Sequence, residues 1–395
     1  MKTLIDLEKA YSPDLFKSAP IVITRGEGAV VYDLNNKPYL DMMSAVSVTN
    51  FGHAHPRLLR ALFTQAGKIS MTSRLCHSEI LGQFLQRACE LTGMDQAIPL
   101  NSGTEAMEAA IKAVRKWAYV HKGIAEDQAE IITFINNFHG RTIAVISAST
   151  EARYKEKFGP LTPGFKSVAY NDMAALTAAM TSNTAAVIME PVQGEAGVIV
   201  PDAGYLKQCQ ALCQQNNVLL ICDEIQTGMG RTGKLIACQH ENVRPSAILL
   251  GKSLGGGLLP VSLFLGQREL MSIFSPGDHG STFGGNPLAA AVAYEALNVL
   301  VEERLCENAE AMGCYFLSQL NNLHSPVIKQ IRSKGLLIGL ELDTSQISAA
   351  DFSARLIENG LLNINTRNQV IRLLPPLMIT SQQIDSAISI IKTVC

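Results

Sequence analysis

The sequence predicts an α/β fold in which helices cover both faces of a mainly parallel sheet. Three short segments carry this prediction, because they are rich in Val, Ile and Leu and lack the polar alternation of a half-exposed strand. The segments are residues 184–190, 217–223 and 246–251. A helical pattern over residues 204–215 separates the first two segments, and Ala211 and Leu212 are expected on its core-facing side.

The remaining elements predict a second, smaller α/β domain made from both ends of the chain. Residues 1–50 include a hairpin pattern over residues 26–33 and are expected to pack with this small domain. Residues 51–295 are expected to form the large domain, and residues 296–395 the small C-terminal domain. In that last part the pattern predicts a helix over 297–320, a strand over 335–342, a helix over 348–359 and a strand over 370–373.

Charge and hydropathy exclude several classes of protein. The 395 residues include 33 Lys and Arg against 35 Asp and Glu, and 17% are charged while 47% are hydrophobic. This composition excludes a disordered chain and argues against nucleic acid or an anionic membrane as partner. No apolar run reaches the roughly 18–20 residues that span a bilayer. Asp6 and Glu8 stand where a signal peptide needs apolar residues, so we expect a cytoplasmic protein.

The nine cysteines predict neither a disulfide framework nor a metal site. Their number is odd, they are scattered, and none forms a CxxC pair. Cys209 and Cys213 are four residues apart within a predicted helix, which is a poor spacing for zinc ligands. We therefore expect buried, reduced thiols.

Polar residues that follow the strands are the candidates for chemistry, because ligands of such sheets bind beyond the carboxyl ends of the strands. The segment Asn101-Ser-Gly-Thr-Glu-Ala begins a helical pattern that runs to Trp117. Ser102 with Glu105 three residues later predicts a capping box, and Gly103 permits close approach of a ligand. The N-terminus of this helix is a candidate phosphate site, and the alternative is a capped helix that binds nothing.

The segment Phe138-His-Gly-Arg combines an aromatic face with a guanidinium group and follows the apolar residues 131–135. The Phe138 ring can stack on a planar ligand while Arg141 binds a carboxylate. An ordinary loop with a core phenylalanine is the alternative.

Asp223 with Glu224, and Lys252, follow two of the predicted strands. Asp223 can hold a protonated ring nitrogen or bind Mg²⁺, as in a nucleotide hydrolase. A phosphate-binding loop of the type GxxxxGK[ST] is excluded, because Ser246 stands where that motif needs glycine. Lys252 lies among apolar and small residues, where a desolvated amine stays neutral and can form a Schiff base, although an exposed lysine is the alternative. Asp223 can thus pair with a pyridine nitrogen and Lys252 can react with an aldehyde. Pyridoxal phosphate carries both of these groups, so the two residues together indicate this cofactor.

Six motifs stand in a fixed order along the chain. They are Asn101-Ser-Gly-Thr-Glu-Ala, Phe138-His-Gly-Arg, Glu190-Pro-Val-Gln-Gly-Glu-Ala-Gly, Asp223-Glu-Ile-Gln-Thr-Gly-Met-Gly-Arg-Thr-Gly, Gly251-Lys-Ser and His279-Gly-Ser-Thr-Phe-Gly-Gly-Asn-Pro. In this order they resemble the class III pyridoxal-phosphate aminotransferases, over essentially the whole chain. The resemblance implies fold type I of the pyridoxal-phosphate enzymes. Within the class the chain is most similar to the ornithine δ-aminotransferases, and the acetylornithine branch comes next.

The resemblance implies roles around the cofactor. Lys252 forms the Schiff base and later moves a proton, Asp223 keeps the pyridine nitrogen protonated, and Gln226 approaches the ring hydroxyl. Phe138 stacks on the ring. The implied cofactor-binding set is Ser102, Gly103, Thr104, Phe138, His139, Asp223, Gln226 and Lys252, with Ser281 and Thr282 from the neighbouring subunit. A homodimer is therefore the smallest expected functional unit.

For the substrates, the resemblance implies transfer of the terminal amine of ornithine to 2-oxoglutarate. The products are glutamate and glutamate semialdehyde, which cyclises to pyrroline-5-carboxylate. Arg141 and Arg372 would hold the two carboxylates of the oxo acid, a task that suits the guanidinium fork. Glu195 would mask one arginine during the ornithine half-reaction.

Two positions depart from the ornithine pattern. Phe16 stands in the stretch where ornithine aminotransferases carry a tyrosine for the α-amino end, and Val46 replaces a second pocket tyrosine, as in the acetylornithine branch. A lost polar contact costs about 1–3 kcal/mol, so N-acetylornithine or another ω-amino acid is the alternative substrate. A racemase, mutase or decarboxylase on the same scaffold is disfavoured by the paired arginines and Glu195. A non-catalytic binding protein would be expected to lack Lys252 or Asp223.

Overall fold

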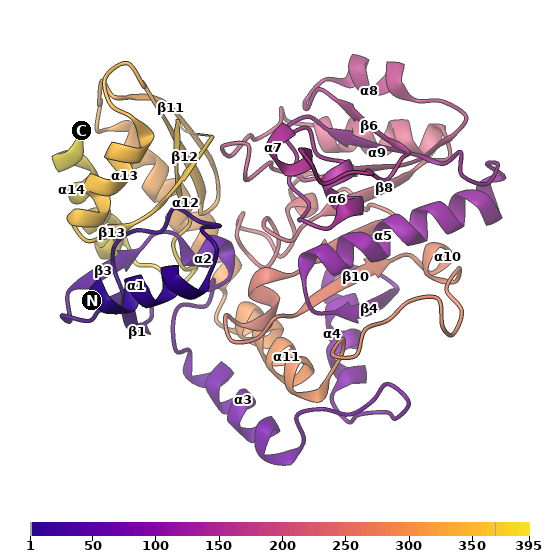
Figure 1. Cartoon of the computed structure of the whole chain (residues 1–395), viewed down its shortest axis with the longest axis horizontal. Coiled ribbons are helices and arrows are strands. Elements are labelled where there is room, and N and C mark those ends of the chain that lie inside the picture. The colour runs from indigo at the N-terminus through magenta and orange to yellow at the C-terminus, as the bar shows by residue number, and fades with distance from the viewer. Residues whose placement is uncertain (1, 368) are drawn as a thin grey trace.

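The computed structural model describes residues 2–367 and 369–395, and its large sheet has the architecture predicted from the sequence (Figure 1). Its seven strands are β4 (Gln96–Leu100), β5 (Glu130–Phe134), β6 (Phe165–Val168), β7 (Thr184–Met189), β8 (Leu219–Asp223), β9 (Ala247–Leu250) and β10 (Ser262–Gly266). They lie in the order β4-β10-β9-β8-β7-β5-β6. The five strands from β9 to β6 are parallel, whereas β10 is antiparallel to both β9 and β4.

Helices cover both faces of this sheet because its strands are apolar on both sides. Alternate residues of a strand point to opposite faces. Ile221 packs in the apolar cluster that contains α5 (Gly103–Trp117), whereas its neighbour Cys222 packs in the cluster that contains α9 (Tyr205–Gln215). The prediction of a buried, mainly parallel sheet between helices is confirmed.

The core-facing side of α9 differs from the prediction. Its buried residues are Tyr205, Leu206, Cys209 and Cys213. Ala211 is exposed and Leu212 is half-buried. Burial follows every fourth residue from Tyr205, which is the helical period, and Ala211 lies on the opposite side of the helix from this row.

Two four-stranded sheets form the other lobe of the molecule, where the two ends of the chain meet (Figure 1). Their strands are β1 (Ile23–Glu27), β2 (Val30–Asp33), β3 (Pro38–Asp41) and β13 (Leu361–Leu362) in one sheet, and β11 (Ile328–Lys334), β12 (Leu337–Leu342), β15 (Val370–Leu373) and β14 (Ile364–Thr366) in the other. β1 and β2 form the predicted hairpin. β3 pairs in parallel with β13, so the N-terminal segment shares a sheet with the C-terminal part of the chain.

The single helix predicted over residues 297–320 is wrong. Two helices stand there, α11 (Pro287–Glu302) and α12 (Leu305–Asn321). The break lies at Arg304, which has a left-handed φ of 53°. Arg304 and Glu303 are exposed, so no burial of apolar surface holds one helix together across them. Because α11 also spans residue 295, the division between the large and small domains stays a prediction.

The other helices complete the two lobes. They are α1 (Lys2–Tyr11), α2 (Ser44–Ser47), α3 (Pro56–Lys68), α4 (Leu81–Thr92), α6 (Ile143–Ser147), α7 (Ala152–Lys155), α8 (Met173–Ala179), α10 (Arg268–Met271), α13 (Ala349–Glu358) and α14 (Ser381–Val394), with the short turns η1 (Ala118–Lys122), η2 (Ala237–Glu241) and η3 (Lys252–Gly255). Across the described ranges, no helix combines the length and the apolar character needed to cross a membrane.

Arg231 joins the two lobes. This residue lies in the loop after β8 and is fully buried. Its Nη1 donates to the carbonyl oxygens of Leu336, at 3.0 Å, and Pro375, at 2.6 Å, while Nη2 donates to the side chain of Asn50. Burial lowers the pKa of Arg231 to about 9, although the charge of Asp41 opposes this effect. One guanidinium thus binds three segments that are far apart in the sequence.

Residues 44–47 form a left-handed turn without glycine. Their φ values lie between 43° and 67°. A left-handed backbone costs about 1–2 kcal/mol per residue, so the turn needs support from its surroundings. Asp41 provides part of it, because its Oδ1 accepts the N–H groups of Met43 at 3.0 Å and Ser44 at 2.8 Å.

We expect Gly313→Ala to destabilise the fold although alanine favours helices. A Cβ at Gly313, in α12, would collide with the backbone carbonyl of Gly335, which itself packs on the backbone of Thr232. Overpacking of this kind costs about 1–3 kcal/mol, so the variant should melt several degrees below the wild type. Gly67→Ala in α3 is the control, since a Cβ there meets nothing within 4 Å. An equal loss in both variants would contradict the close approach.

Candidate active site

A cavity of about 230 Å³ lies beyond the carboxyl ends of β8 and β9. The candidates from the sequence that line it are Ser102, Gly103, Thr104, Phe138, His139, Arg141, Glu195, Asp223, Gln226 and Lys252. Gly140, Glu190, Ile225 and Thr227 also line it and were not proposed. All four lie inside the six motifs, and that position in the sequence could have identified them. The structure brings these residues together, and the role of each stays a prediction.

The N-terminus of α5 faces the cavity as an anion cradle. Ser102 caps the helix as predicted, because its Oγ accepts the N–H of Glu105 at 3.2 Å while the Glu105 carboxylate accepts the N–H of Ser102. The N–H groups of Gly103 and Thr104 come before the first intrahelical bond. A Cβ at Gly103 would lie 2.7 Å from the Cδ1 of Ile225. The backbone at position 103 can therefore lie this close to Ile225 only because the residue is glycine. Two free N–H groups at the positive end of a helix suit a phosphate.

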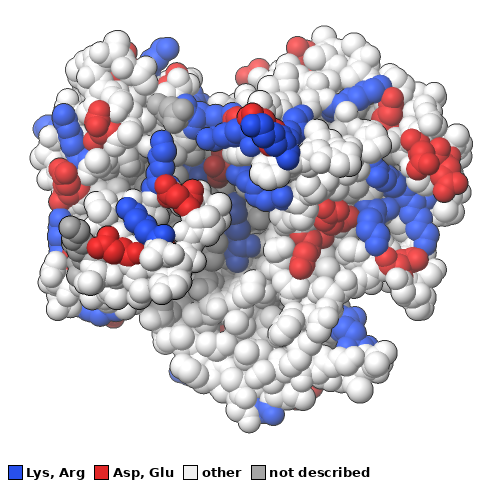
Figure 2. All heavy atoms as spheres, in the orientation of Figure 1, with Lys and Arg blue, Asp and Glu red and all other residues white. Residues whose placement is uncertain are grey.

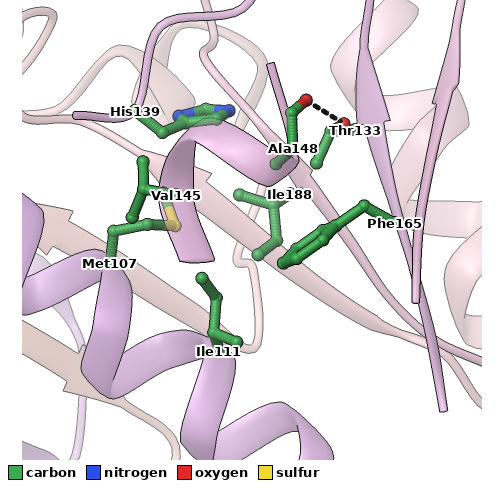
Figure 3. Close-up of a pocket in the computed structure, with 8 residues that line it drawn as sticks. All are labelled: Met107, Ile111, Thr133, His139, Val145, Ala148, Phe165 and Ile188. Carbon is green, nitrogen blue, oxygen red and sulfur yellow. Dashed lines mark hydrogen bonds between the residues drawn. The ribbon is translucent and has the colours of Figure 1, made fainter. Parts of the chain in front are cut away.

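Asp223 and His139 form a buried pair at the floor of the cavity. The Asp223 Oδ2 lies 2.7 Å from His139 Nδ1, and its Oδ1 accepts the N–H of Ile225 at 3.1 Å. Burial alone would lower the pKa of His139, but the hydrogen bond and the charge of Asp223 raise it. The other face of the imidazole packs on an apolar pocket that includes Met107 and Val145 (Figure 3). Nε2 finds no partner among the described residues, so the ring is oriented by Asp223 alone.

Glu224, the neighbour of Asp223, has a structural role. Its buried carboxylate accepts the N–H groups of Ala237 at 2.9 Å and Cys238 at 2.8 Å, which begin η2. The two adjacent acids therefore face different surroundings. Only Asp223 lines the cavity.

Lys252 follows β9 and opens η3, with a left-handed φ of 49°. Burial lowers the pKa of its amine to about 8, although the charge of Glu195 opposes this effect. A substantial fraction of the amine is therefore neutral near physiological pH and able to act as a nucleophile.

Glu190 bridges two loops beside Lys252. Its Oε1 accepts the N–H of Phe138 at 3.0 Å, and its Oε2 accepts the N–H of Gly194 at 3.3 Å. Burial raises the pKa of Glu190 to about 7, against the opposing charge of His139. The carboxyl group thus ties the Phe138 segment to the Glu195 segment.

Glu195 covers Arg372. Its Oε1 lies 2.7 Å from the Nη1 of Arg372, which also donates to the Gln226 side chain at 3.3 Å. Burial would raise the pKa of Glu195, yet the charges of Arg372 and Lys252 lower it. Arg372 is 1% exposed and does not line the cavity, whereas Glu195 does. The guanidinium is therefore masked by an ionised carboxylate.

Arg141 is arranged differently. Its guanidinium carbon lies 3.7 Å from the ring centre of Tyr154 and 4.3 Å from that of Phe138. Nη1 donates to the Gly140 carbonyl at 3.2 Å. Within the described part of the chain Arg141 has no carboxylate partner, so its charge is available to an anionic ligand.

Besides Arg372, four candidates lie outside the cavity of the single chain. Ser281 accepts a hydrogen bond from the Asn101 side chain at 2.9 Å, and Thr282 is exposed. Phe16 is 80% exposed. Val46 is half-buried against a small apolar cluster made of Val192, Val198, Leu337 and Leu374.

Neither the cysteines nor other ligand side chains form a second centre in the part of the chain that the structure describes. All nine cysteines are free; four are buried, but Cys76, Cys314 and Cys395 are exposed, so burial was wrongly expected for these three. Among residues 2–367 and 369–395 no group of His, Cys, Asp and Glu is placed to hold a metal ion.

Comparison with known proteins agrees with this geometry. Residues 12–395 match the family described as Aminotransferase class-III. The chain belongs to the class III aminotransferases. This aminotransferase is 48% identical to the ornithine aminotransferase of Geobacillus sp. (strain WCH70) over 391 residues, which cover 99% of this chain and 98% of the relative. The predictions of an aminotransferase and of the fold type I architecture are confirmed.

Solved structures support the same membership. The ornithine aminotransferase from Toxoplasma gondii ME49 matches this aminotransferase with a TM-score of 0.98 and 43% identity, covering 100% of this chain and 94% of that one. A second structure of the Toxoplasma gondii enzyme has pyridoxal phosphate at partial occupancy in its active site. The acetylornithine aminotransferase from Elizabethkingia anophelis matches with a TM-score of 0.90 and 43% identity, covering 100% and 98%.

We expect Glu190→Gln to flatten the pH dependence of stability. The pKa of Glu190 is about 7 in the folded protein against an ordinary 4.5, so between these values the unfolded chain releases a proton that the folded chain keeps. Stability from this group is therefore present at low pH and is lost as pH rises to about 7, by on the order of 1–3 kcal/mol. Thermal unfolding between about pH 5 and pH 8 should show a smaller decline for the variant than for the wild type.

The exposed Glu269 provides the control, because Glu269→Gln makes the same change of charge at the surface. A decline with pH that is the same in Glu190→Gln and the wild type would contradict the raised pKa of Glu190.

Proposed function

We propose that this protein is a pyridoxal-phosphate-dependent aminotransferase that transfers the terminal amine of ornithine to 2-oxoglutarate. The products are glutamate and glutamate semialdehyde, which cyclises to pyrroline-5-carboxylate. The observation that carries the proposal is the contrast between the two arginines, since Arg141 is open to the cavity and Arg372 is masked by Glu195. The full-length similarity to ornithine aminotransferases supports it.

The residues of the cavity fit pyridoxal phosphate. When bound, this cofactor supplies an aldehyde that carries the amino group and a ring that accepts electrons. Lys252 would hold the aldehyde carbon, Asp223 the pyridine nitrogen, and the N–H groups at the N-terminus of α5 the phosphate. Phe138 would lie against the ring and Gln226 near its hydroxyl. The 2.7 Å contact with His139 Nδ1 keeps the Asp223 carboxylate in place for a cationic nitrogen, and Nε2 of that imidazole has no partner among the described residues.

Lys252 would also move the proton. Its Nζ is shifted toward the neutral amine by burial, so it can accept a proton from the amine-bearing carbon of the substrate. Glu195 and Glu190 line the same cavity as Lys252. Near the Lys252 amine, Glu195 would hold a negative charge and Glu190 could hold a proton.

The two arginines would select two substrate shapes in turn. In the ornithine half-reaction a single carboxylate binds Arg141, while Glu195 neutralises Arg372 so that no unpaired guanidinium faces the uncharged part of the substrate. In the second half-reaction Glu195 moves aside, and the two carboxylates of 2-oxoglutarate bind Arg141 and Arg372. Bidentate guanidinium pairs favour this dicarboxylate over an oxo acid with one carboxylate.

We also propose that two copies of the chain form the working unit in the cytoplasm. Large apolar side chains stand at the surface, among them Leu75, at 95% exposure, and Phe283, at 61%. Phe283 is next to Ser281 and Thr282, which lie outside their own cavity and are available to the phosphate of a partner. Nine unpaired cysteines suit a reducing compartment.

N-acetylornithine is the second candidate amine donor. Val46 gives the turn at residues 44–47 an apolar side chain, and Phe16 provides no hydroxyl. Similarity to an acetylornithine aminotransferase at 43% identity supports this alternative.

We expect ornithine to be the faster donor in a single turnover. The purified enzyme with its cofactor is mixed with ornithine or N-acetylornithine without an oxo acid, and loss of the yellow absorbance is followed together with the cyclic product. Lys252→Ala is the control; after borohydride reduction it should carry no covalently attached cofactor by mass spectrometry. Faster turnover of N-acetylornithine would assign the enzyme to the other substrate, and covalent cofactor on Lys252→Ala would overturn the role of Lys252.

We expect Glu195→Ala to shift the preference from ornithine toward glutamate. The variant leaves Arg372 uncovered, which favours a second carboxylate and disfavours the neutral chain of the diamine. A masking carboxylate of this kind should change the ratio of the two half-reaction rates by about tenfold or more, since hydrogen bonds between charged groups contribute about 1.5–3 kcal/mol. Rapid-mixing measurement of both half-reactions tests this, and an unchanged ratio would refute the masking.

A further inference from the structure

We propose that the ion pair between Glu151 and Arg367 sets the spacing of the two carboxylate-binding arginines and so determines the chain length of the dicarboxylic oxo acid. The inference rests on the proposed function of Arg141 and Arg372. It assigns a specificity role to residues that do not line the cavity.

The first arginine depends on α7. Tyr154 lies in this four-residue helix, and its ring carries the Arg141 guanidinium at 3.7 Å. The Tyr154 ring also meets the edge of Phe138, with the ring centres 6.3 Å apart. A guanidinium stacked on an aromatic ring moves when that ring moves, because the cation–π attraction holds the two together. The position of α7 therefore sets the position of Arg141.

The second arginine belongs to a hairpin. β14 and β15 pair in antiparallel register, with Ile364 opposite Arg372 and Thr366 opposite Val370. Arg372 points to Glu195 from β15, and Arg367 lies in the turn between the two strands. A movement of this hairpin displaces both arginines together.

The Glu151–Arg367 pair connects these two supports across the boundary between the lobes. Glu151 precedes α7, and its Oε2 lies 2.8 Å from the Nη1 of Arg367. The two side chains are only 22% and 27% exposed. Arg153 also approaches Glu151, at 3.6 Å, but is 72% exposed and belongs to α7 itself, so it makes no connection between the lobes. Basic and acidic side chains gather where the two lobes meet in Figure 2.

A continuous series of contacts thus joins the two arginines outside the cavity. It runs from Arg372 along the hairpin to Arg367, through Glu151 to Tyr154, and ends at Arg141. An oxo acid that spans both arginines fits one spacing, and a shorter or longer acid must strain this connection. Ornithine places its one carboxylate on Arg141 while Arg372 is masked, so its half-reaction does not depend on the spacing.

The test compares chain lengths in variants of the pair. Glu151→Gln, Arg367→Gln and the double variant each remove the ion pair, Arg153→Gln is the matched control, and the exchange Glu151→Arg with Arg367→Glu rebuilds the pair with its charges reversed. For each holoenzyme kcat/KM is measured with 2-oxoglutarate, its four-carbon homologue oxaloacetate and its six-carbon homologue 2-oxoadipate. The dissociation constants of succinate, glutarate and adipate are measured by calorimetry as a readout without turnover.

We expect the preference for five carbons to fall about two- to fivefold in Glu151→Gln and in Arg367→Gln, as for a partly exposed pair. The double variant should lose no more than the single ones, because both changes remove the same interaction. Arg153→Gln should keep the preference, the exchanged pair should recover part of it, and the ornithine half-reaction should change less than twofold.

An unchanged preference in the Glu151 and Arg367 variants, or an equal loss in Arg153→Gln, would overturn the proposal. If the single variants fail to fold by thermal unfolding, the exchanged pair decides, since recovery of folding without recovery of the preference is also a refutation. A wild type that binds no dicarboxylate and transaminates none of the three oxo acids would instead refute the proposed function itself.

Discussion

The burial of the Arg231 guanidinium is the interaction on which the placement of the other elements depends. Its charge is compensated by carbonyl oxygens of the small lobe and by the Asn50 side chain, with no carboxylate at ion-pair distance in the described ranges. A buried charge that loses such partners is strongly destabilising. β12 and the segment after β15 must therefore return to the same place beside the loop that follows β8. This is the reason that Arg372, on β15, meets Gln226, on that loop.

Desolvation acts on both the buried Glu190 and the half-buried Glu195, yet their pKa values shift in opposite directions. Burial raises the pKa of both Glu190 and Glu195, but only Glu195 has a guanidinium and an ammonium group close enough to reverse the effect. Glu190 is held by two backbone N–H groups and lies near the charge of Asp223. Two acids whose surroundings push their pKa values apart can take different tasks in one cavity. One remains an anion that covers Arg372, and the other exchanges a proton near neutrality.

The residues that follow regular strands and begin helices were predictable, because local patterns mark them. Asp223 and Lys252 follow continuous apolar strands, and Ser102 with Glu105 has the spacing of a capping box. Arrangements that depend on distant segments were not predictable. The Glu151–Arg367 pair joins positions 216 residues apart, and no local pattern connects them.

Hydrophobic periodicity also failed to predict where one helix ends and the next begins. Apolar residues continue on both sides of Arg304, so the break between α11 and α12 was missed; it depends on one left-handed residue at an exposed site. Glu190 was seen as part of a motif, but its raised pKa depends on burial beside Asp223, which arises only when β7 and β8 pair. Phe16 and Val46 were placed by resemblance alone, and the single chain leaves both outside the cavity.

The left-handed turn at residues 44–47 has a consequence for how this enzyme can change over evolutionary time. Glycine would adopt the backbone conformation of each of these four residues with less strain. A β-branched valine, as at position 46, is among the residues least suited to a positive φ. The turn therefore stores strain next to the apolar cluster of Val192, Val198, Leu337 and Leu374, to which both lobes contribute. Substitutions at position 46 alter the packing of that cluster and the stability of the whole chain at the same time. A lineage that acquires a new donor amine through this position must first possess surplus stability elsewhere.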